Sequence, residues 1–285
     1  MSGFLRALTR GSGWLGLVGL LLIALLLLVA AFGPFFDLPD PTRTNLRARM
    51  VAPTLSWAGF GAHPLGTDQL GRDILSRIVA GSRVTLVVAG AAVVLGGIVG
   101  TLLGLVAGYF GGWLDRLLMR LADIQLAVPL MLLALMVIAA LGPSLQNLVM
   151  VLALVSWVRY ARIVRGQVLA VREREFVQSA RAIGASSSRI ILRHILPNVL
   201  TPAIVVATLE LARVIVLEAG LSFLGLGVQP PFASWGRMLA EGRTYIASAW
   251  WIITFPGLAL MLTVLAVNLL GDWLRDYLDP RLQVR

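Results

Sequence analysis

Long uncharged, apolar stretches alternate with short arginine-rich segments along this chain. Because a helix needs about 20 apolar residues to cross the core of a bilayer, each long stretch predicts a membrane span. The stretches cover residues 11–36, 84–114, 124–158, about 198–220 and 244–271. The third contains the helix breaker Gly142-Pro143-Ser144, so we divide it into spans at about 124–141 and 144–158. The pattern therefore predicts an all-α integral membrane protein with six transmembrane helices.

The first of these stretches has two interpretations. It could be a secretory signal peptide that ends at the small residues Val29-Ala30-Ala31. Its apolar run is much longer than the core of about 7–15 residues in a signal peptide. We therefore expect a membrane anchor that the protein retains.

The polar segment that follows, residues 37–83, is expected to lie outside the membrane. Its last part, residues 69–82, has apolar positions at helical spacing, which predicts an amphipathic helix on the membrane surface. We divide the chain into this N-terminal region, residues 1–83, and a core of five spans, residues 84–285. A stripe of small residues in the first core span predicts close helix packing, and it consists of Gly96, Gly100, Gly104 and Gly108.

The composition agrees with a membrane protein and excludes several other classes. Hydrophobic residues make up 58% of the chain and charged residues 13%, against about 45–50% and about 25% in soluble domains. A soluble domain could not bury this much apolar surface, and disordered chains are poor in hydrophobic residues. The chain has no Cys, which excludes disulfides, thiol catalysis and Cys-type zinc sites.

The charged residues predict a topology and exclude one function. The net charge is +10 and all 24 basic residues are Arg, so the chain lacks the Lys that a nucleotide-binding P-loop requires. Fifteen Arg lie in segments assigned to the cytoplasm and eight in segments assigned to the outside, which places both termini in the cytoplasm. Because the Arg lie between apolar runs, we expect no nucleic-acid partner. His63 and His194 fall on opposite sides of the membrane, so we expect no metal site.

The strongest basic cluster lies in the cytoplasmic segment of about residues 159–197. Arg159, Arg162 and Arg165 recur every three residues and fall in one sector of a helix that leaves the membrane. The simplest interpretation is an interfacial anchor to anionic lipid headgroups.

Beyond these Arg, the segment predicts two short helices joined by a turn. The first covers residues 173–183 and has an apolar face made of Phe176, Ala180 and Ile183. Gly184 ends it, and the second, residues 189–196, stops at Pro197. A pair of helices like this could dock into a groove of a partner protein or lie on the lipid surface.

Within this segment, Gln178-Ser179-Ala180, Gly184 and Leu196-Pro197 resemble the EAA loop of binding-protein-dependent ABC importer permeases. That motif reads EAA, three residues, Gly, nine residues and I-x-L-P. The chain departs from it at Gln178, Ser179 and His194, while the spacing from Gly to Pro fits. Further segments are similar to the C-type permease of the dipeptide/oligopeptide/nickel importers, and these are residues 63–73, 193–198, 218–227, 229–236 and 268–280.

The resemblance implies a type I ABC importer transmembrane domain in the cytoplasmic membrane, with peptides as cargo and nickel chelates or glutathione as alternatives. It also implies a second homologous permease subunit, two ATPase subunits that bind ATP and Mg, and an external solute-binding protein. The chain itself would hold no cofactor. In this family the EAA loop is a coupling helix seated in the ATPase, a role that carries over to Gln178, Ser179, Ala180, Gly184 and Pro197. From the helical geometry we add Phe176 and Arg181 as contacts.

The fifth span carries charged residues with two interpretations. Glu210 and Arg213 are three residues apart and can pair. The pair could line the pore and meet a zwitterionic peptide, or it could be a structural ion pair at the interface with the second permease, which we favour. Nearer the outer end, Gly220, Gly225 and Gly227 predict non-helical backbone. We therefore expect an outer gate, or the contact with the binding protein, in residues 220–236, and its candidate residues are Glu218, Ser222, Phe223, Gly225 and Gly227.

Two other classes of protein fit the sequence less well. A membrane enzyme would need a convergent set of nucleophile, acid–base or metal-binding residues, and no span contains a Ser/Lys or Ser/His pair or an HExxH motif. A proton-coupled secondary transporter would carry buried carboxylates and an inverted repeat. Only Glu210 and Glu218 qualify as carboxylates, and no repeat is visible.

Overall fold

The computed structural model describes residues 13–56, 59–60 and 63–278, and nearly all of the chain it describes is helical. The long helices are α2 (Gly13–Phe32), α3 (Ile74–Phe110), α6 (Leu145–Val171), α9 (Leu196–Phe223) and α11 (Trp251–Leu278). The shorter helices are α4 (Gly112–Ala127), α5 (Leu130–Leu141), α7 (Glu175–Ala182), α8 (Ser187–Ile190) and α10 (Trp235–Gly242).

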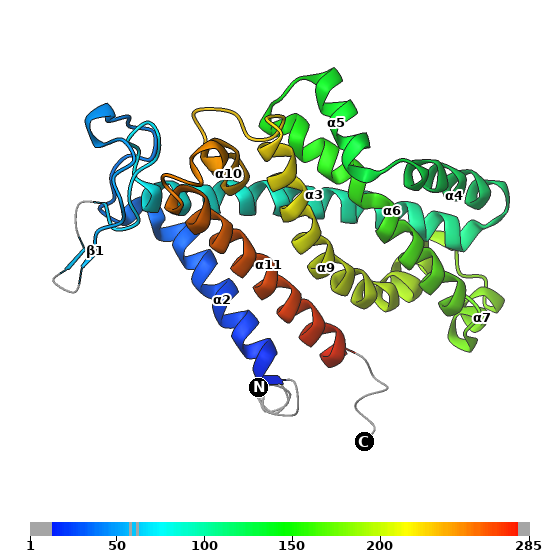
Figure 1. Cartoon of the computed structure of the whole chain (residues 1–285). Helices are drawn as coiled ribbons and strands as arrows, with labels where there is room; N and C mark the ends of the chain where they lie inside the picture. Colours follow the sequence, from blue (N-terminus) through cyan, green and yellow to red (C-terminus); the bar gives the residue numbers. More distant parts are fainter. Residues whose placement is uncertain (1–12, 57–58, 61–62, 279–285) are drawn as a thin grey trace.

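Irregular elements connect these helices. A π-helix, Ile191–Ile195, joins α8 to α9, and short 3₁₀ turns cover Gly33–Phe35, Leu46–Ala48 and Arg243–Tyr245. A small antiparallel hairpin, β1 (Leu55–Ser56) and β2 (Gly59–Phe60), projects from the segment between α2 and α3, with Leu55 opposite Phe60 (Figure 1).

The centre of the bundle is a close contact between α3 and α6. A Cβ atom on Gly100 would lie 2.3 Å from the carbonyl oxygen of Trp157, and one on Gly104 would lie 2.6 Å from that of Ala161. Each step of four residues on α3 thus matches a step of four on α6, so the two helices run in the same direction. The glycine stripe predicted from the sequence is confirmed as a packing surface.

The bent pair α4–α5 provides a sixth crossing. Among the described residues, five helices are long and apolar enough to span a membrane alone, and α4 and α5 qualify together, with a bend of 93° between them. Because α3 and α6 are parallel, the chain between them has to return across the membrane, and α4–α5 are the helices that lie there (Figure 1). The break predicted at Gly142 is confirmed, and a second one at Pro129 was not predicted. The residue before it, Val128, is extended, as the residue before a proline prefers.

The N-terminal helix α2 packs antiparallel to the last helix, α11. A Cβ atom on Gly16 would lie 2.3 Å from the Trp273 ring, and one on Gly19 would lie 2.9 Å from the Ala266 carbonyl oxygen. The beginning of α2 and the end of α11 therefore lie at the same end of the molecule (Figure 1). Residues 1–12 and 279–285, including four of the Arg used to predict the topology, lie outside the described residues.

The predicted surface helix at residues 69–82 is wrong. Residues 74–82 are instead the first turns of α3, which the Asp73 carboxylate caps by accepting a 2.8 Å hydrogen bond from the Ser76 backbone N–H. No helix breaker separates these turns from the span, and Arg77, which lay in the predicted surface helix, is buried in an ion-pair cluster. The helix is therefore continuous through the predicted boundary at residues 83 and 84.

The predicted stop at Pro197 is also wrong, because Ser187–Phe223 forms one continuous helical rod. The π-turn that precedes it ends with the Leu196 N–H bonded to the Ile191 carbonyl. Pro197 then stands in the first turn of α9, directly after the π-turn. Pro202 lies inside α9. The last span begins at Trp251 rather than residue 244, because α10 and a turn precede it.

The α3–α6 contact leads to a prediction with a matched control. We expect Gly100→Ala to lower the unfolding temperature of the protein in detergent, because the added methyl group would meet backbone atoms of α6 that cannot move aside, at a cost of about 1–3 kcal/mol. The control is Gly90→Ala on the same helix, where nothing lies within 4 Å of the new Cβ atom. Equal unfolding temperatures for the two variants would contradict the packing argument.

Candidate functional site

A two-helix bracket, defined as α7, the Gly184 turn and residues 187–195, stands at the end of the bundle away from α10 (Figure 1). The predicted helix–Gly–helix order is confirmed. Gly184 has a φ of +80°, a conformation that residues with a side chain rarely adopt. The Ala185 N–H donates a 3.0 Å hydrogen bond to the Ala180 carbonyl, which closes the end of α7.

The apolar residues of α7 point in two directions. Val177 and Ala180 are buried and pack with Val168 of α6 and Ile190 and Ile195 of the second arm. Ile183 is 85% exposed and Phe176 is 41% exposed. The single apolar face predicted for Phe176, Ala180 and Ile183 is therefore wrong, because the core lies against the Val177 side of α7. The outward-facing Phe176 and Ile183 are left free to contact a partner.

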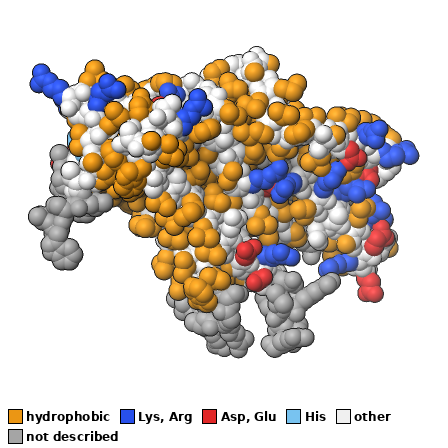
Figure 2. All heavy atoms as spheres, viewed as in Figure 1, with side chains coloured by type: hydrophobic (Ala, Val, Ile, Leu, Met, Phe, Trp, Pro, Cys, Tyr) orange, Lys and Arg blue, Asp and Glu red, His pale blue; other side chains and the backbone are white. Residues whose placement is uncertain are grey.

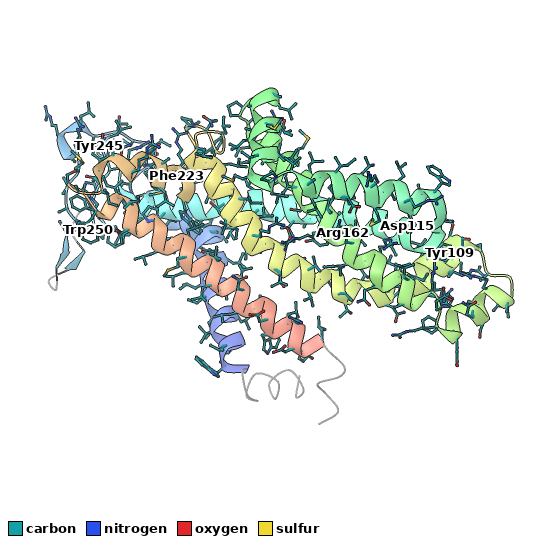
Figure 3. All side chains as sticks on the ribbon, turned by 45° about the vertical axis from the view of Figure 1, so that its right-hand side comes forward. Tyr109, Asp115, Arg162, Phe223, Tyr245 and Trp250 are labelled. Atoms are coloured by element: carbon teal, nitrogen blue, oxygen red, sulfur yellow. The ribbon has the colours of Figure 1, made fainter. Side chains whose placement is uncertain are left out.

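The polar residues of the predicted motif attach the bracket to the bundle or face outward. The Gln178 amide donates to the Arg172 carbonyl at 3.3 Å and to the Glu173 carboxylate at 3.4 Å. The Arg181 guanidinium lies 5.9 Å from the centre of the Tyr109 ring at the end of α3, a cation–π distance (Figure 3). Ser179 and Pro197 are exposed.

The Phe176 ring lies next to the His194 ring, with 6.4 Å between the ring centres. This contact joins the two arms of the bracket across the Gly184 turn. Among the described residues, no group of three or more His, Asp or Glu could hold a metal ion.

The three arginines of α6 each pair with a carboxylate on another helix, which the lipid-anchor interpretation did not foresee. Arg165 holds Asp115 of α4, with 2.6 Å from Nη2 to Oδ2, and Arg162 pairs with Asp123 of α4 (Figure 3). Arg159 pairs with Glu210 of α9 at 3.1 Å. Spacing along one helix reveals the common sector, but partners on other helices depend on the tertiary packing.

A charged triad, Arg159–Glu210–Arg213, lies near the middle of α6 and α9. Glu210 is 1% exposed, and its Oε1 atom accepts a 3.3 Å hydrogen bond from Arg213 Nη1. The pair predicted from the three-residue spacing is confirmed, and Arg159 is the member that sequence reasoning missed. Two guanidinium groups on one carboxylate oxygen offset its charge at a depth where an isolated charge would be costly.

The C-terminal end of α9 carries a compact turn built around Ser222. Its hydroxyl donates a 2.7 Å hydrogen bond to buried Glu218 and accepts one of 3.0 Å from the Val228 N–H. A Cβ atom on Gly227 would lie 2.0 Å from the Ser222 Oγ atom, so only glycine fits there. Helical backbone continues to Phe223, and the non-helical part predicted from residue 220 begins at Leu224.

The rest of this turn is held by one amide. Gln229 Nε2 donates to the carbonyls of Gly225 and Gly227, at 3.0 Å each, and Gly225 has a φ of +84°. Phe223 stands next to the turn and is partly exposed (Figure 3). The turn is therefore a fixed structure with one aromatic side chain at its edge.

An ion-pair cluster around Asp68 and Glu241, which the sequence did not reveal, ties the segment before α3 to α10. Asp68 accepts from Arg72 at 2.6 Å and from Arg77 at 2.5 Å, and both arginines also reach Glu241, at 2.7 and 2.9 Å. Arg237 completes the cluster at 2.8 Å from Glu241. Burial raises the pKa of Glu241, but the charges of Arg77 and Arg72 outweigh it and hold that pKa below its usual value.

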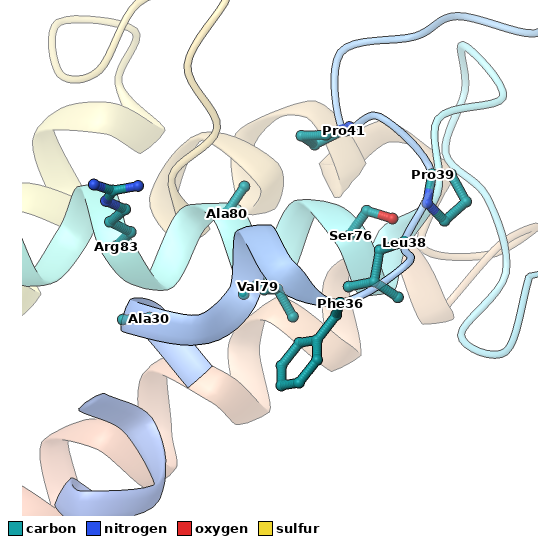
Figure 4. Close-up of a pocket in the computed structure, with 10 residues that line it drawn as sticks. Ala30, Phe36, Leu38, Pro39, Pro41, Ser76, Val79, Ala80 and Arg83 are labelled. Atoms are coloured by element: carbon teal, nitrogen blue, oxygen red, sulfur yellow. The ribbon is translucent and has the colours of Figure 1, made fainter. Parts of the chain in front are cut away.

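Next to this cluster, a hollow of about 300 Å³ lies where the end of α2 meets the beginning of α3 (Figure 4). Its walls include Phe36, Leu38 and Val79, with Ser76 and Arg83 as polar members.

A profile of the family described as "Binding-protein-dependent transport system inner membrane component" matches residues 100–284. The chain belongs to this family. It is a permease subunit of an ABC importer and a multi-pass protein of the inner membrane. The match begins within α3 and includes both the bracket and the Ser222 turn.

Close relatives of this permease cover nearly its whole length. It is 46% identical over 269 residues to a dipeptide transport system permease protein of Alkalihalophilus pseudofirmus. That alignment covers 94% of this chain and 86% of the relative. It is 43% identical over 280 residues to a di/tripeptide transport system permease protein of Pseudomonas aeruginosa, covering 98% and 92%. A glutathione transport system permease protein of Pectobacterium atrosepticum is 46% identical over 222 residues, covering 78% and 74%.

Solved structures support the fold. The inward-facing methionine ABC transporter MetNI matches with a TM-score of 0.57 at 21% identity, over 70% of this permease and 96% of that chain. An amino acid ABC transporter matches with a TM-score of 0.55 at 16% identity, over 70% and 92%. The predicted architecture, an ABC importer transmembrane domain, is confirmed.

The Asp68–Glu241 cluster gives a prediction for the permease. We expect Glu241→Gln to loosen residues 63–73 by about 3 kcal/mol, because Arg72 and Arg77 would then share one carboxylate, Asp68, and Arg237 would lose its own. Hydrogen exchange of these residues is the measurement. The control is Glu173→Gln, which removes an exposed carboxylate next to Arg172. Equal exchange in both variants would contradict the prediction.

The same cluster predicts a pH dependence. Because the pKa of Glu241 is lower in the folded protein than in the unfolded chain, its stabilising effect is complete above the ordinary carboxylate pKa. The effect is lost as the pH falls through the lowered folded value. Acid should therefore lower the hydrogen-exchange protection factors of residues 63–73 more in the wild type than in Glu241→Gln.

Proposed function

We propose that this permease moves dipeptides or oligopeptides into the cytoplasm by alternating access. It would pair with a second homologous permease, two ATPase subunits and an external solute-binding protein. ATP and Mg would be bound by the ATPases, because this chain has no Lys for a P-loop and no catalytic motif of its own. Both termini would lie in the cytoplasm, as the Arg distribution indicates.

The bracket is the observation that carries the coupling role. Its buried side is fixed to α6 and α9 through Val177 and Ala180, while Ile183 and Phe176 project outward. A short helix with exposed apolar side chains and a charged border is suited to a groove on a partner protein. The coupling loop was predicted at about residues 159–197, but residues 159–171 are the end of α6, so the loop in this proposal is residues 172–197. Gln178, Ser179, Ala180, Arg181, Gly184 and Pro197 belong to it.

The Ser222 turn is our candidate for the outer gate. Glu218, Ser222, Gly225 and Gly227 hold its shape, and partly exposed Phe223 stands at its edge. An irregular backbone at the end of a span is tolerated where protein covers it or where it lines a cavity. A gate in residues 220–236 would sit between the binding protein and the path through the membrane.

The cargo rests on the named relatives. Two of them are permeases for dipeptides or for di- and tripeptides, and a third is one for glutathione, itself a small peptide-like acid. Peptides are therefore the first candidates and glutathione the second.

The decisive experiment combines purification with transport. The tagged permease would be isolated from its native membrane in mild detergent, and its companions identified by mass spectrometry. Recovery of a second permease and an ATPase, followed by ATP-dependent uptake of a labelled dipeptide into vesicles, would support the proposal. A chain that purifies alone would contradict it, and uptake of glutathione in preference to dipeptides would correct the cargo.

The coupling role predicts that Gly184→Arg inserts normally but separates ATP hydrolysis from uptake. The added side chain has open space, yet the φ of +80° strains any residue other than glycine, so the turn would change shape. We expect peptide uptake to fall at least about tenfold while the permease is still recovered from membranes. The control is Gly166→Arg on α6, also in open space but in ordinary helical backbone. Normal uptake by Gly184→Arg would rule out the coupling role.

A further inference from the structure

The Arg159–Glu210–Arg213 triad contains two guanidinium groups and only one carboxylate, so one positive charge has no counter-charge within it. Both guanidinium groups lie against the same oxygen of Glu210, at 3.1 and 3.3 Å. The triad lies near the middle of two helices that are each long enough to cross a membrane. Charged residues at this depth rarely face lipid, and they usually face a partner or a water-filled path.

Both guanidinium groups have an open edge. The Arg159 side chain is 50% exposed and the Arg213 side chain 29%, and each touches Glu210 through a single nitrogen. Within the described part of the chain, no second carboxylate pairs with either of them. On the face shown in Figure 2, basic side chains gather over the region where α6 and α9 lie, with hydrophobic side chains around them. A guanidinium with an open edge can hold a carboxylate by two parallel hydrogen bonds.

Two buried polar atoms next to the triad also lack hydrogen-bond partners. The second oxygen of Glu210, Oε2, is buried and has no hydrogen-bond partner among the described residues. The same is true of the hydroxyl of Tyr160, the neighbour of Arg159 on α6. Buried polar groups are satisfied in nearly all native structures. Because a carboxylate oxygen accepts hydrogen bonds, Oε2 needs a donor, which water or an N–H group of the passing peptide could supply.

We propose that this triad binds the C-terminal carboxylate of the peptide during its passage through the membrane, an inference that rests on the proposed peptide cargo. Every linear peptide with a free C-terminus carries this group, whatever its side chains, so it suits a transporter of varied sequences. Glu210 holds the two guanidinium groups on one atom and offsets one of their charges. A single excess charge would attract the carboxylate without holding it too tightly to leave.

The test uses the complete transporter in vesicles, with its partner permease, ATPases and binding protein. We expect Arg159→Gln and Arg213→Gln each to lower dipeptide uptake about tenfold, with all subunits still present in the purified complex. Arg159→Lys and Arg213→Lys keep the charge but lose the two-pronged geometry, so their uptake should be intermediate. The control, Arg162→Gln, removes an arginine of α6 that pairs with Asp123, and it should leave uptake largely unchanged.

Several outcomes would overturn the carboxylate site. Normal uptake by both Gln variants would overturn it and leave the proposed function intact. Loss of the partner permease from the Gln variants, together with normal uptake by the Lys variants, would identify an interface ion pair instead. A wild-type complex that retains its ATPases but takes up no dipeptide would overturn the proposed cargo, and this inference with it.

Discussion

The contact between the backbones of α3 and α6 organises the rest of the bundle. In a bilayer, helices gain little from burying apolar surface against each other, so close van der Waals contact between small residues becomes a main attraction. Gly96, Gly100, Gly104 and Gly108 allow that contact over four successive turns. Because the two helices are parallel, the chain between them has to cross back, which gives the bent pair α4–α5 its place. The direction of α6 then determines the end at which the bracket stands.

Ion pairs between helices hold the functional ends in position. At the end of the bundle that carries α10, the cluster around Asp68 and Glu241 fixes the segment before α3 against α10. Along α6, three arginines reach carboxylates on α4 and α9. Such pairs are useful inside a membrane protein because each one both neutralises a charge and selects a single arrangement of two helices.

One continuous helix connects the proposed sites. The rod Ser187–Phe223 begins in the bracket, passes the triad at Glu210 and ends at the Ser222 turn. A rigid element that reaches from one end of the bundle to the other can carry a displacement between them without a chain of small adjustments. The π-turn at Ile191–Ile195 lies where this rod leaves the bracket, and local irregularities of this kind are frequent at functional sites.

Much of the fold could be predicted from the sequence because the bilayer restricts what an apolar stretch can do. Span number, the break at Gly142, the glycine stripe and the helix–Gly–helix bracket all follow from local composition and spacing. Helix ends were less predictable: Arg77 lay in a predicted surface helix and Pro197 suggested a stop, yet an ion-pair cluster buried the first and a π-turn accommodated the second.

In the candidate site, too, some contacts could be predicted from the sequence and others could not. Glu210 and Arg213 pair because they are three residues apart on one helix, and the sequence determined that spacing. The addition of Arg159, the partners of Arg162 and Arg165, and the direction in which Phe176 faces depend on which helices lie side by side. A sequence records the spacing along each helix, whereas a contact between helices is decided by the packing of both, and only the tertiary structure supplies that.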